Sequence, residues 1–506
     1  MNLTGAYQRT RGFIRDALKG EALRAKAMRG GAWLGSGSVA EQAARFARNM
    51  LLTRLLAPNA FGTMAIVLSS ASVVQTLTDV GERAAIIQSP HGDEPRYLNA
   101  SWWLGFARVA VCYAIICALA PWIAHFYGRP ELSGLLRLAL VSVLFNGAMS
   151  PRCALIQRHM KLGRWAVITN GGGLCGVAIT VILSFFMRDV WALAIGYCSE
   201  DASRFVLSYI ICPGRPRLRI DWHATRELLN FSRGVFGMAP LNLIINRSDI
   251  FVLGRLFSLS SLGLYSMAVN LVATPSVFIT NMLGQTLLPA MSGIHQDTER
   301  LNRILLEVTS WLALLGLPAT LLVALSAPSM LRLAYGARYA AAAGPLAVAA
   351  GVVLLTVLNS LLTTLLFSRG VPGVHRSAIA ITAVVMLAAV YPAAKLLGPV
   401  GAQIAALAAN AIGYLYQILR LRFLTGLRLS QYGSTFLAPA LGCLAALAVV
   451  LASRRLAFAA RPIPDLVLSF VCCTLVAAAC ATAHLRTWNR QSRAYSRKDT
   501  ESAAAL

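Results

Sequence analysis

Charged residues are scarce in this sequence. Only 13% of its 506 residues are Asp, Glu, Lys or Arg, whereas 57% are hydrophobic and the mean hydropathy is +0.63. This composition lies outside the range of water-soluble globular proteins. The apolar runs are continuous, so the alternating strands of an outer-membrane barrel are missing as well. We therefore expect an all-α polytopic membrane protein.

Motifs that would support catalysis or cofactor binding are also missing. The seven histidines fall in expected loops or at the ends of apolar runs, away from any nucleophile motif or metal-ligand spacing. No G-x-x-x-x-G-K-[ST] motif is present, and no expected loop exceeds about 25 residues, which leaves no room for a soluble catalytic domain. We expect no enzymatic activity, no cofactor and no metal site. Any transport would be driven by an ion gradient, the membrane potential or the substrate's own gradient.

Two further features are absent from the sequence. The first thirty residues are basic and broken by charge, whereas a cleavable signal peptide has an uninterrupted apolar core. Most of the ten cysteines lie in apolar runs, and Cys472 and Cys473 are adjacent, which suits neither a strain-free disulfide nor a zinc site. We predict no structural disulfides.

Acidic residues are outnumbered by basic ones. There are 46 Lys and Arg against 20 Asp and Glu, a formal net charge of +26. When both termini are placed in the cytoplasm, about 29 of the basic residues fall on the inner side and about 10 in outer loops, which is the positive-inside asymmetry of membrane proteins. The charge therefore assigns orientation, and we expect no nucleic-acid partner. We expect both termini to be cytoplasmic.

The sequence contains an internal repeat. "LLTRLLAPNAFG" from Leu51 and "VLGRLFSLSSLG" from Val252 align at an offset of 201, which pairs Arg54 with Arg255 and a glycine with a glycine. Apolar runs of about 20 residues number about fourteen in the whole chain. Six of them precede a basic loop and six follow it. A repeat of six spans begins and ends on the same side, so we expect two parallel six-helix bundles plus two C-terminal helices.

These patterns predict the domain organisation. The expected segments are a basic cytoplasmic N-terminal segment at 1–30, an N-terminal six-helix bundle at 31–211, a cytoplasmic linker at 212–230, a C-terminal six-helix bundle at 231–422, two extra transmembrane helices at 423–485, and a cytoplasmic tail at 486–506.

A few charged side chains lie inside the expected spans, where each costs about 2.5–3.5 kcal/mol on insertion scales. Glu41, Arg45 and Arg48 are spaced four and three residues apart, on one face of the first span. The seventh span carries Arg247 and Asp249. Arginines that line a central cleft from both bundles would suit an anionic substrate, because guanidinium groups pair with phosphate oxygens. We predict that Arg45, Arg48 and Arg247 bind a phosphate-bearing substrate.

An alternative interpretation is that these charges neutralise one another. Glu41 with Arg45, and Arg247 with Asp249, would then form internal ion pairs, and Glu200 with Arg204 in the sixth span has the same favourable spacing. Carboxylates held in a low-dielectric bundle can also exchange protons between the two sides of the membrane. The candidates for ion coupling are Glu41, Asp249, Glu200 and Asp201.

Several longer blocks resemble a known family. They include "LLTRLLAPNAFGTMAIVLSSASVVQTLTDVGERAAIIQ", "APWIAHFYGRPELSGLLRL", "SPRCALIQRHMKLGRWAVI" and "FVLGRLFSLSSLGLYSMAVNLV". Together they are similar to the polysaccharide-transporter (Wzx-type oligosaccharide flippase) branch of the MOP exporter superfamily, over roughly residues 30–425. One departure is "DVGERAAI" from Asp79, where relatives often read "DLGL".

The resemblance implies two six-helix bundles and translocation of an undecaprenyl-diphosphate-linked oligosaccharide across the bacterial inner membrane, for exopolysaccharide, capsule or O-antigen assembly. It also implies a positively charged central cavity, in which Arg45, Arg48 and Arg247 would lie, and alternating access. The expected partners are the lipid-linked oligosaccharide, membrane lipid and a polysaccharide polymerase of the same pathway.

Three alternatives remain open from the sequence. A multidrug-type antiporter of the same superfamily would need a cavity of net negative charge, which the arginines disfavour. A lipid II flippase would differ in that loss of its gene is lethal. A membrane polysaccharide polymerase or ligase is an enzyme that needs a long outer loop with catalytic Arg or His, and the longest expected outer loop, from Ser326, is short and lacks His.

Overall fold

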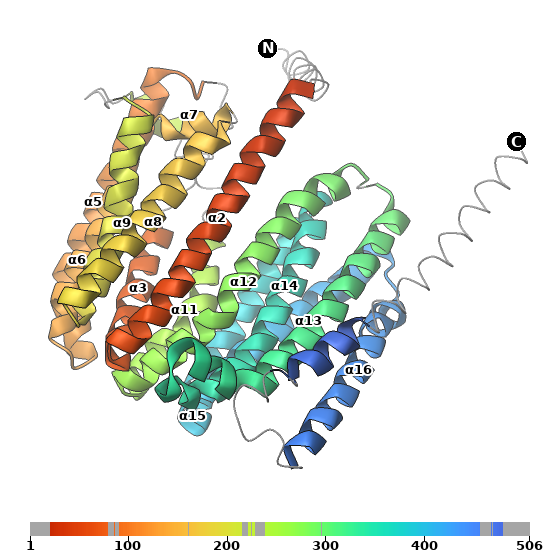
Figure 1. Ribbon diagram of the computed structural model, residues 1–506. Coiled ribbons are helices and arrows are strands. Elements are labelled where there is room, and N and C mark those ends of the chain that lie inside the picture. Colours follow the sequence, from red (N-terminus) through yellow and green to blue (C-terminus); the bar gives the residue numbers. More distant parts are fainter. Residues whose placement is uncertain are drawn as a thin grey trace, which may run out of the picture. The chain divides into compact units, whose positions relative to one another are not determined.

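The structure is a computed structural model of residues 1–506. It describes residues 21–78, 86, 91–159, 161–214, 221–223, 225–227, 238–294, 296–455, 467 and 469–478. All regular elements in this described part of the chain are helices (Figure 1). The tail predicted at 486–506, most of the segment predicted at 1–30 and most of "DVGERAAI" lie outside the described residues.

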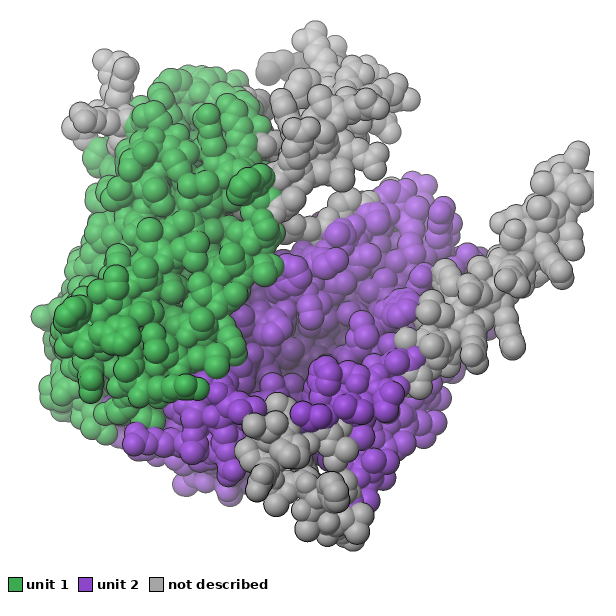
Figure 2. All heavy atoms as spheres, in the orientation of Figure 1, with its two compact units in different colours: residues 1–243 green, residues 244–506 purple. Residues whose placement is uncertain are grey.

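The chain divides into two compact units, residues 1–243 and 244–506, which Figure 2 colours separately. The first unit contains helices α2 (Glu21–Leu55), α3 (Pro58–Thr78), α5 (Pro95–Phe126), α6 (Glu131–Gly147), α7 (Cys153–Arg158), α8 (Leu162–Phe186) and α9 (Val190–Ile211).

Within the first unit, α8 packs against both α2 and α9, and α6 packs against α3, α5 and α9. Side chains from α3, α5 and α6 form one buried apolar cluster, which includes Val74, Val109 and Leu140. Helix α9 begins where the carboxylate of Asp189 accepts a hydrogen bond of 2.6 Å from the Val190 N–H, which satisfies one of the free donors of the first turn. This packing places α8 in contact with α2, which carries Glu41 and Arg45, and with α9, which carries Glu200 and Arg204.

The second unit contains α11 (Ala239–Leu256), which begins just before the division, and α12 (Leu259–Ser292), α13 (Thr298–Tyr335), the 3-10 helix η1 (Ala337–Ala342), α14 (Ala343–Ser368), α15 (Pro372–Thr425) and α16 (Leu429–Arg455). Helix α14 packs against α12, α13 and α15, and α13 also packs against α16. A buried leucine cluster that includes Leu301, Leu305, Leu361 and Leu365 joins α13 and α14.

Seven helices in the described part of the chain are long and apolar enough to cross a membrane: α5, α8, α12, α13, η1 with α14, α15 and α16. One of these is the 54-residue α15, which is interrupted at Gly398, where φ is 66° and ψ is −151°. Each arm of α15 exceeds the roughly 20 residues that a span needs. Large apolar side chains face outward, such as Trp122, Phe186 and Leu396, which are 78%, 81% and 81% exposed. The prediction of fourteen spans stays a prediction.

The repeated stretch has the same local structure in both units. Helix α2 ends at Leu55 and α3 begins at Pro58, and at the same offset of 201 α11 ends at Leu256 and α12 begins at Leu259. The Leu56 N–H bonds to the Leu52 carbonyl at 2.8 Å, and the Phe257 N–H bonds to the Leu253 carbonyl at 2.9 Å. The arginine of each copy lies in the last helical turn, where a cation is favourable. The repeat therefore encodes one helix–turn–helix twice.

Candidate functional site

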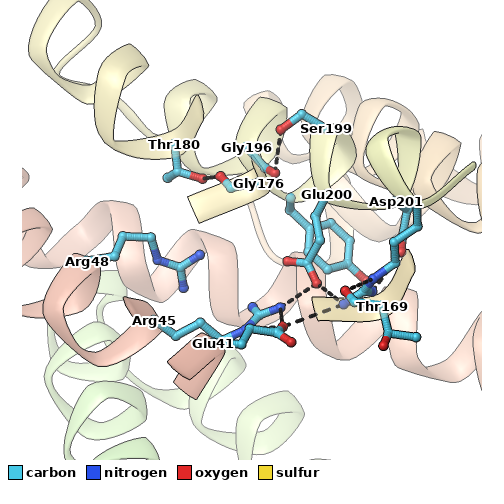
Figure 3. Close-up of polar contacts among 12 residues, drawn as sticks. Glu41, Arg45, Arg48, Thr169, Gly176, Thr180, Gly196, Ser199, Glu200 and Asp201 are labelled. Carbon is cyan, nitrogen blue, oxygen red and sulfur yellow. Dashed lines mark hydrogen bonds and ion pairs between the residues drawn. The ribbon is translucent and has the colours of Figure 1, made fainter. Parts of the chain in front are cut away.

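The first candidate site is a charge network between α2 and α9 (Figure 3). Arg45 donates from Nε and Nη2 to Oε1 of Glu41, at 3.0 and 2.7 Å. Nη2 of Arg45 also forms an ion pair with Oε1 of Glu200 on α9. The Glu41 and Glu200 side chains are 13% and 8% exposed, and the Arg45 side chain is 26% exposed. The network therefore ties α2 to α9 in a mostly water-excluded position.

Arg204 completes the network from α9. Its Nη2 lies 2.7 Å from Oε1 of Glu200 and 3.7 Å from Oε1 of Glu41, and its Nη1 lies 3.1 Å from Oδ1 of Asp201. Its Nε donates to the Thr169 carbonyl of α8 at 3.2 Å. All three guanidinium nitrogens are thus engaged within the protein. Arg204 therefore holds the carboxylates in place and is poorly available to a ligand.

Glycines of α8 let the charged helices approach this closely. A Cβ added at Gly173 would lie 2.2 Å from Oε1 of Glu41, and one at Gly176 would lie 2.5 Å from Cβ of Glu200. At Gly172 it would lie 2.3 Å from Cγ of Arg204. Real Cβ atoms do not approach other atoms so closely, so a side chain at Gly173 would displace the Glu41 carboxylate, and one at Gly172 or Gly176 would press against the backbone of α9. The three glycines, which we call the α8 glycine seam, make room for the charge network.

Arg48 lies one turn beyond Arg45 on α2. Its Nε and Nη2 donate to Oδ1 of the neighbouring Asn49, at 3.3 and 3.1 Å. Among the described residues no carboxylate forms an ion pair with it. The network of three carboxylates and two arginines carries one net negative charge, and Arg48 brings the local sum to zero. Arg48 is therefore the arginine of this group whose guanidinium is best placed to accept an anion from outside the protein.

The second candidate site lies in the second unit, around Asp249 of α11. Oδ2 of this buried carboxylate accepts a 2.5 Å hydrogen bond from the hydroxyl of Tyr265 on α12. The same hydroxyl accepts a 2.6 Å hydrogen bond from Nε2 of Gln403 on α15. Oδ1 of Asp249 accepts from the Ile250 N–H at 2.8 Å. Asp249 is thus bound by a tyrosine and a backbone amide, and the expected ion pair with Arg247 is not formed.

We predict that Tyr265→Phe lowers the stability of the protein. The substitution removes the O–H donor to Asp249 and the acceptor for Gln403, and a buried polar group that loses its partner costs about 1–3 kcal/mol. The measurement is the midpoint of thermal unfolding of the purified protein in detergent. Tyr391→Phe is the control, because Tyr391 is 51% exposed. Equal midpoints for the two variants would contradict the role of the Tyr265 hydroxyl.

The sequence prediction and the structure agree on part of these sites. The ion pairs expected along each helix, Glu41 with Arg45 and Glu200 with Arg204, are both present. The pairing of Arg45 with Glu200 was not predicted, because it joins residues 155 positions apart. The glycine seam was also missed, although its G-x-x-x-G spacing from Gly172 is a known signal of close helix packing. Arg247 and Asp249 belong to the second unit, residues 244–506.

A thiol pair at the end of α9 was also missed. Sγ of Cys153, at the start of α7, lies 3.6 Å from Sγ of Cys212, and both side chains are buried. The hydrogen bond from Cys153, together with the positive charges of Arg164 and Arg152, lowers the pKa of the Cys212 thiol. Among the described residues no group of three or more His, Cys, Asp or Glu side chains is arranged to hold a metal.

Comparison with known proteins gives matches over much of the chain. A family model described as "Polysaccharide biosynthesis protein" matches residues 51–344. The succinoglycan biosynthesis transport protein ExoT of Rhizobium meliloti is 25% identical over 58% of this chain and 60% of its own length. The lipopolysaccharide biosynthesis protein WzxC of Escherichia coli is 23% identical over 63% of this chain and 65% of its own length. The matched segment therefore covers less than two thirds of either relative.

Solved structures share the fold. The inward closed conformation of the lipid II flippase MurJ is similar with a TM-score of 0.71 and 13% sequence identity, over 90% of this chain and 99% of the other. An inward-facing multidrug resistance transporter of the MATE family, of the MOP superfamily, is similar with a TM-score of 0.55 and 13% identity, over 76% of this chain and 95% of the other. At these identities the likeness concerns the fold alone. Together with the apolar helices, it identifies a multi-pass membrane protein.

Proposed function

Because this chain belongs to the polysaccharide biosynthesis protein family whose model it matches, we propose that it is a flippase rather than an enzyme. Its substrate would be an oligosaccharide linked through a diphosphate to a polyprenyl lipid. The protein would move this substrate across the bacterial inner membrane by alternating access. The relatives named as a transport protein for succinoglycan and as a lipopolysaccharide biosynthesis protein support the polysaccharide part of this proposal. The product would serve exopolysaccharide, capsule or O-antigen assembly, with a polymerase as a further partner.

The observation that carries the proposal is that Arg48 has no ion-pair partner among the described residues. Its side chain is partly buried on α2, within the apolar part of the chain. A guanidinium in such a place favours an anionic partner, and its planar N–H groups match phosphate oxygens. We propose that Arg48 and the exposed side of Arg45 bind the diphosphate, and that Arg247 on α11 binds it as well.

We further propose that carboxylates couple transport to an ion gradient. Glu41, Glu200 and Asp201 share two arginines in the first unit, and Asp249 of the second unit is buried and accepts hydrogen bonds from the neutral Tyr265 hydroxyl and Ile250 N–H. Carboxylates in such surroundings can change protonation as the protein alternates between its states. Both termini would be cytoplasmic, and the fourteen spans would form two six-helix bundles plus two C-terminal helices, with the segment boundaries predicted from the sequence.

We predict that Arg48→Ala abolishes most of the transport activity. Loss of one charged hydrogen-bonding partner costs about 1.5–3 kcal/mol, which corresponds to a tenfold to hundredfold loss of substrate binding. The measurement is the amount of surface polysaccharide in the native host when a deletion of the gene is complemented with each variant. Arg54→Ala is the matched control, since Arg54 is an exposed arginine in the last turn of the same helix.

The same experiment discriminates between the alternatives. If Arg48→Ala, at normal membrane levels, supports the same amount of polysaccharide as Arg54→Ala, the binding role of Arg48 is wrong. If the deletion itself is lethal rather than merely removing a surface glycan, the protein carries lipid II instead. Glycosyltransferase and polymerase genes beside the gene would support the proposed role.

A further inference from the structure

The charge network of the first unit is balanced only while no anion is bound. Glu41, Glu200 and Asp201 are matched by Arg45, Arg204 and Arg48, and the carboxylate side chains are 13%, 8% and 6% exposed. A diphosphate diester that approaches Arg48 brings one negative charge on each phosphate. Because a mostly buried site screens charge poorly, this excess is unfavourable unless a positive charge enters with the substrate.

We propose that binding of a diphosphate at Arg48 and Arg45 is coupled to uptake of a proton by the carboxylates of this network, chiefly by Glu200. The inference rests on the proposed function, and it names the carboxylate whose protonation would be linked to substrate binding. Without a bound anion Arg48 balances the third carboxylate, and the proposal follows from the loss of this balance when a diphosphate binds.

Glu200 is singled out by the geometry of its contacts. Its Oε1 accepts from both Arg45 and Arg204, so it stands between the two cations. When phosphate oxygens take Arg45, Glu200 loses one of its cations and gains an anion as neighbour. It is then left with Arg204, which is also bound to Asp201. Two carboxylates that share one guanidinium repel each other, and protonation of one of them relieves the repulsion.

The surroundings contain no better proton acceptor among the described residues. Helix α8 contributes the uncharged Thr169 and Asn170, and the Asn170 amide, when oriented to donate, lies 3.0 Å from Oε2 of Glu41. Near Glu200 and Asp201, α9 also carries the hydroxyl of Tyr197 and the thiol of Cys198, and Gln75 of α3 donates to the Tyr197 hydroxyl at 3.1 Å. Phenol and thiol groups are already protonated at neutral pH, so the carboxylates must take up the proton.

Because binding and protonation are linked, each favours the other. Substrate binding should strengthen as the pH falls. With one coupled proton, the dissociation constant increases about tenfold for each unit of rising pH across the coupled range. The stoichiometry of proton uptake is therefore the direct test, since it reports the coupling even where the affinity is modest.

The experiment is isothermal titration of the purified full chain in lipid nanodiscs with farnesyl-diphospho-N-acetylglucosamine. Both phosphates of this probe are diesters, so neither titrates near neutral pH. Repeating the titration in buffers of different ionisation enthalpy counts the protons taken up for each ligand bound. We expect about one proton for the wild type, and close to none for Glu200→Gln, which should bind the probe almost equally at about pH 6 and about pH 8.

Two controls make the outcomes decisive. Glu94→Gln, a neutral replacement of a carboxylate at the N-terminus of α5 that pairs with Arg96 and His91, should take up the same number of protons as the wild type. Glu41→Gln and Asp201→Asn show whether the proton resides on another carboxylate of the network. Probe binding without proton uptake, or uptake that persists in all three network variants, overturns the coupling. Absence of probe binding at every pH overturns the proposed function itself.

Discussion

Replacing Gly176 with leucine should prevent the first unit from folding normally. A Cβ at this position would lie 2.5 Å from Cβ and 2.9 Å from Cα of Glu200. The second of these atoms belongs to the backbone, so α8 and α9 would have to move apart, and the Glu200 carboxylate would move away from Arg45. Such overpacking at a backbone contact belongs to the class of substitutions that cost about 4 kcal/mol or more.

The measurement is the yield of monodisperse protein in detergent and the midpoint of thermal unfolding. A loss of 4 kcal/mol corresponds to a fall of about 8 °C or more for a unit of this size. Gly163→Ala is the matched control in the same helix, because a Cβ there meets nothing within 4 Å. It should leave the midpoint unchanged or raise it slightly, since alanine favours helix over glycine. A Gly176→Leu protein that unfolds at the wild-type temperature would show that the glycine seam is not a close contact.

The helical class of the fold followed from the scarcity of charge and the length of the apolar runs, because every backbone group in lipid must bond within its own helix. The offset of 201 between the two repeats also predicted a detail, since the turn after α2 and the turn after α11 occur at equivalent positions. Such features depend on local sequence and on composition. They can therefore be obtained without knowing which helices are neighbours.

The contacts between different helices could not be predicted from local sequence and composition. Spacing along one helix predicted the pairs Glu41–Arg45 and Glu200–Arg204, but not that Arg45 reaches across to Glu200. Spacing also suggested Arg247 as the partner of Asp249, whereas the carboxylate bonds to Tyr265 of the next helix. Two residues apart, side chains on a helix do not face each other, so this pairing was unfavourable from the start.

The repeat shows how far equivalent positions can diverge in chemistry. At the offset of 201, Arg48 of the first unit corresponds to Asp249 of the second, so one position carries opposite charges in the two copies. The partner of Asp249, Tyr265, corresponds to Met64, which has no hydroxyl to donate. The second unit thus satisfies its buried charge with neutral donors, whereas the first unit uses a network of charges. This difference favours separate roles for the two units in the proposed mechanism.

Removing the shared carboxylate by Glu200→Ala should destabilise the protein, because it leaves the buried charge network unbalanced. Arg45 keeps Glu41 and Arg204 keeps Asp201, but the balance of the group shifts to one net positive charge in a mostly buried place. Loss of one partner from a fully buried pair costs about 3–5 kcal/mol. Since the arginines are about a quarter exposed, we expect about 2–3 kcal/mol here, measured as the shift in the thermal unfolding midpoint.

A double-mutant cycle with Arg204→Ala separates this charge effect from the loss of packed methylene groups. If the two side chains stabilise the protein mainly as a pair, the double variant should be more stable than the sum of the single effects predicts, by about 1–3 kcal/mol. Additive effects would mean that each side chain acts through packing alone. In that case the charges of the network would not interact appreciably, and a bound phosphate would not favour protonation of its carboxylates. The cycle therefore tests, by stability alone, the physical premise of the proposed coupling.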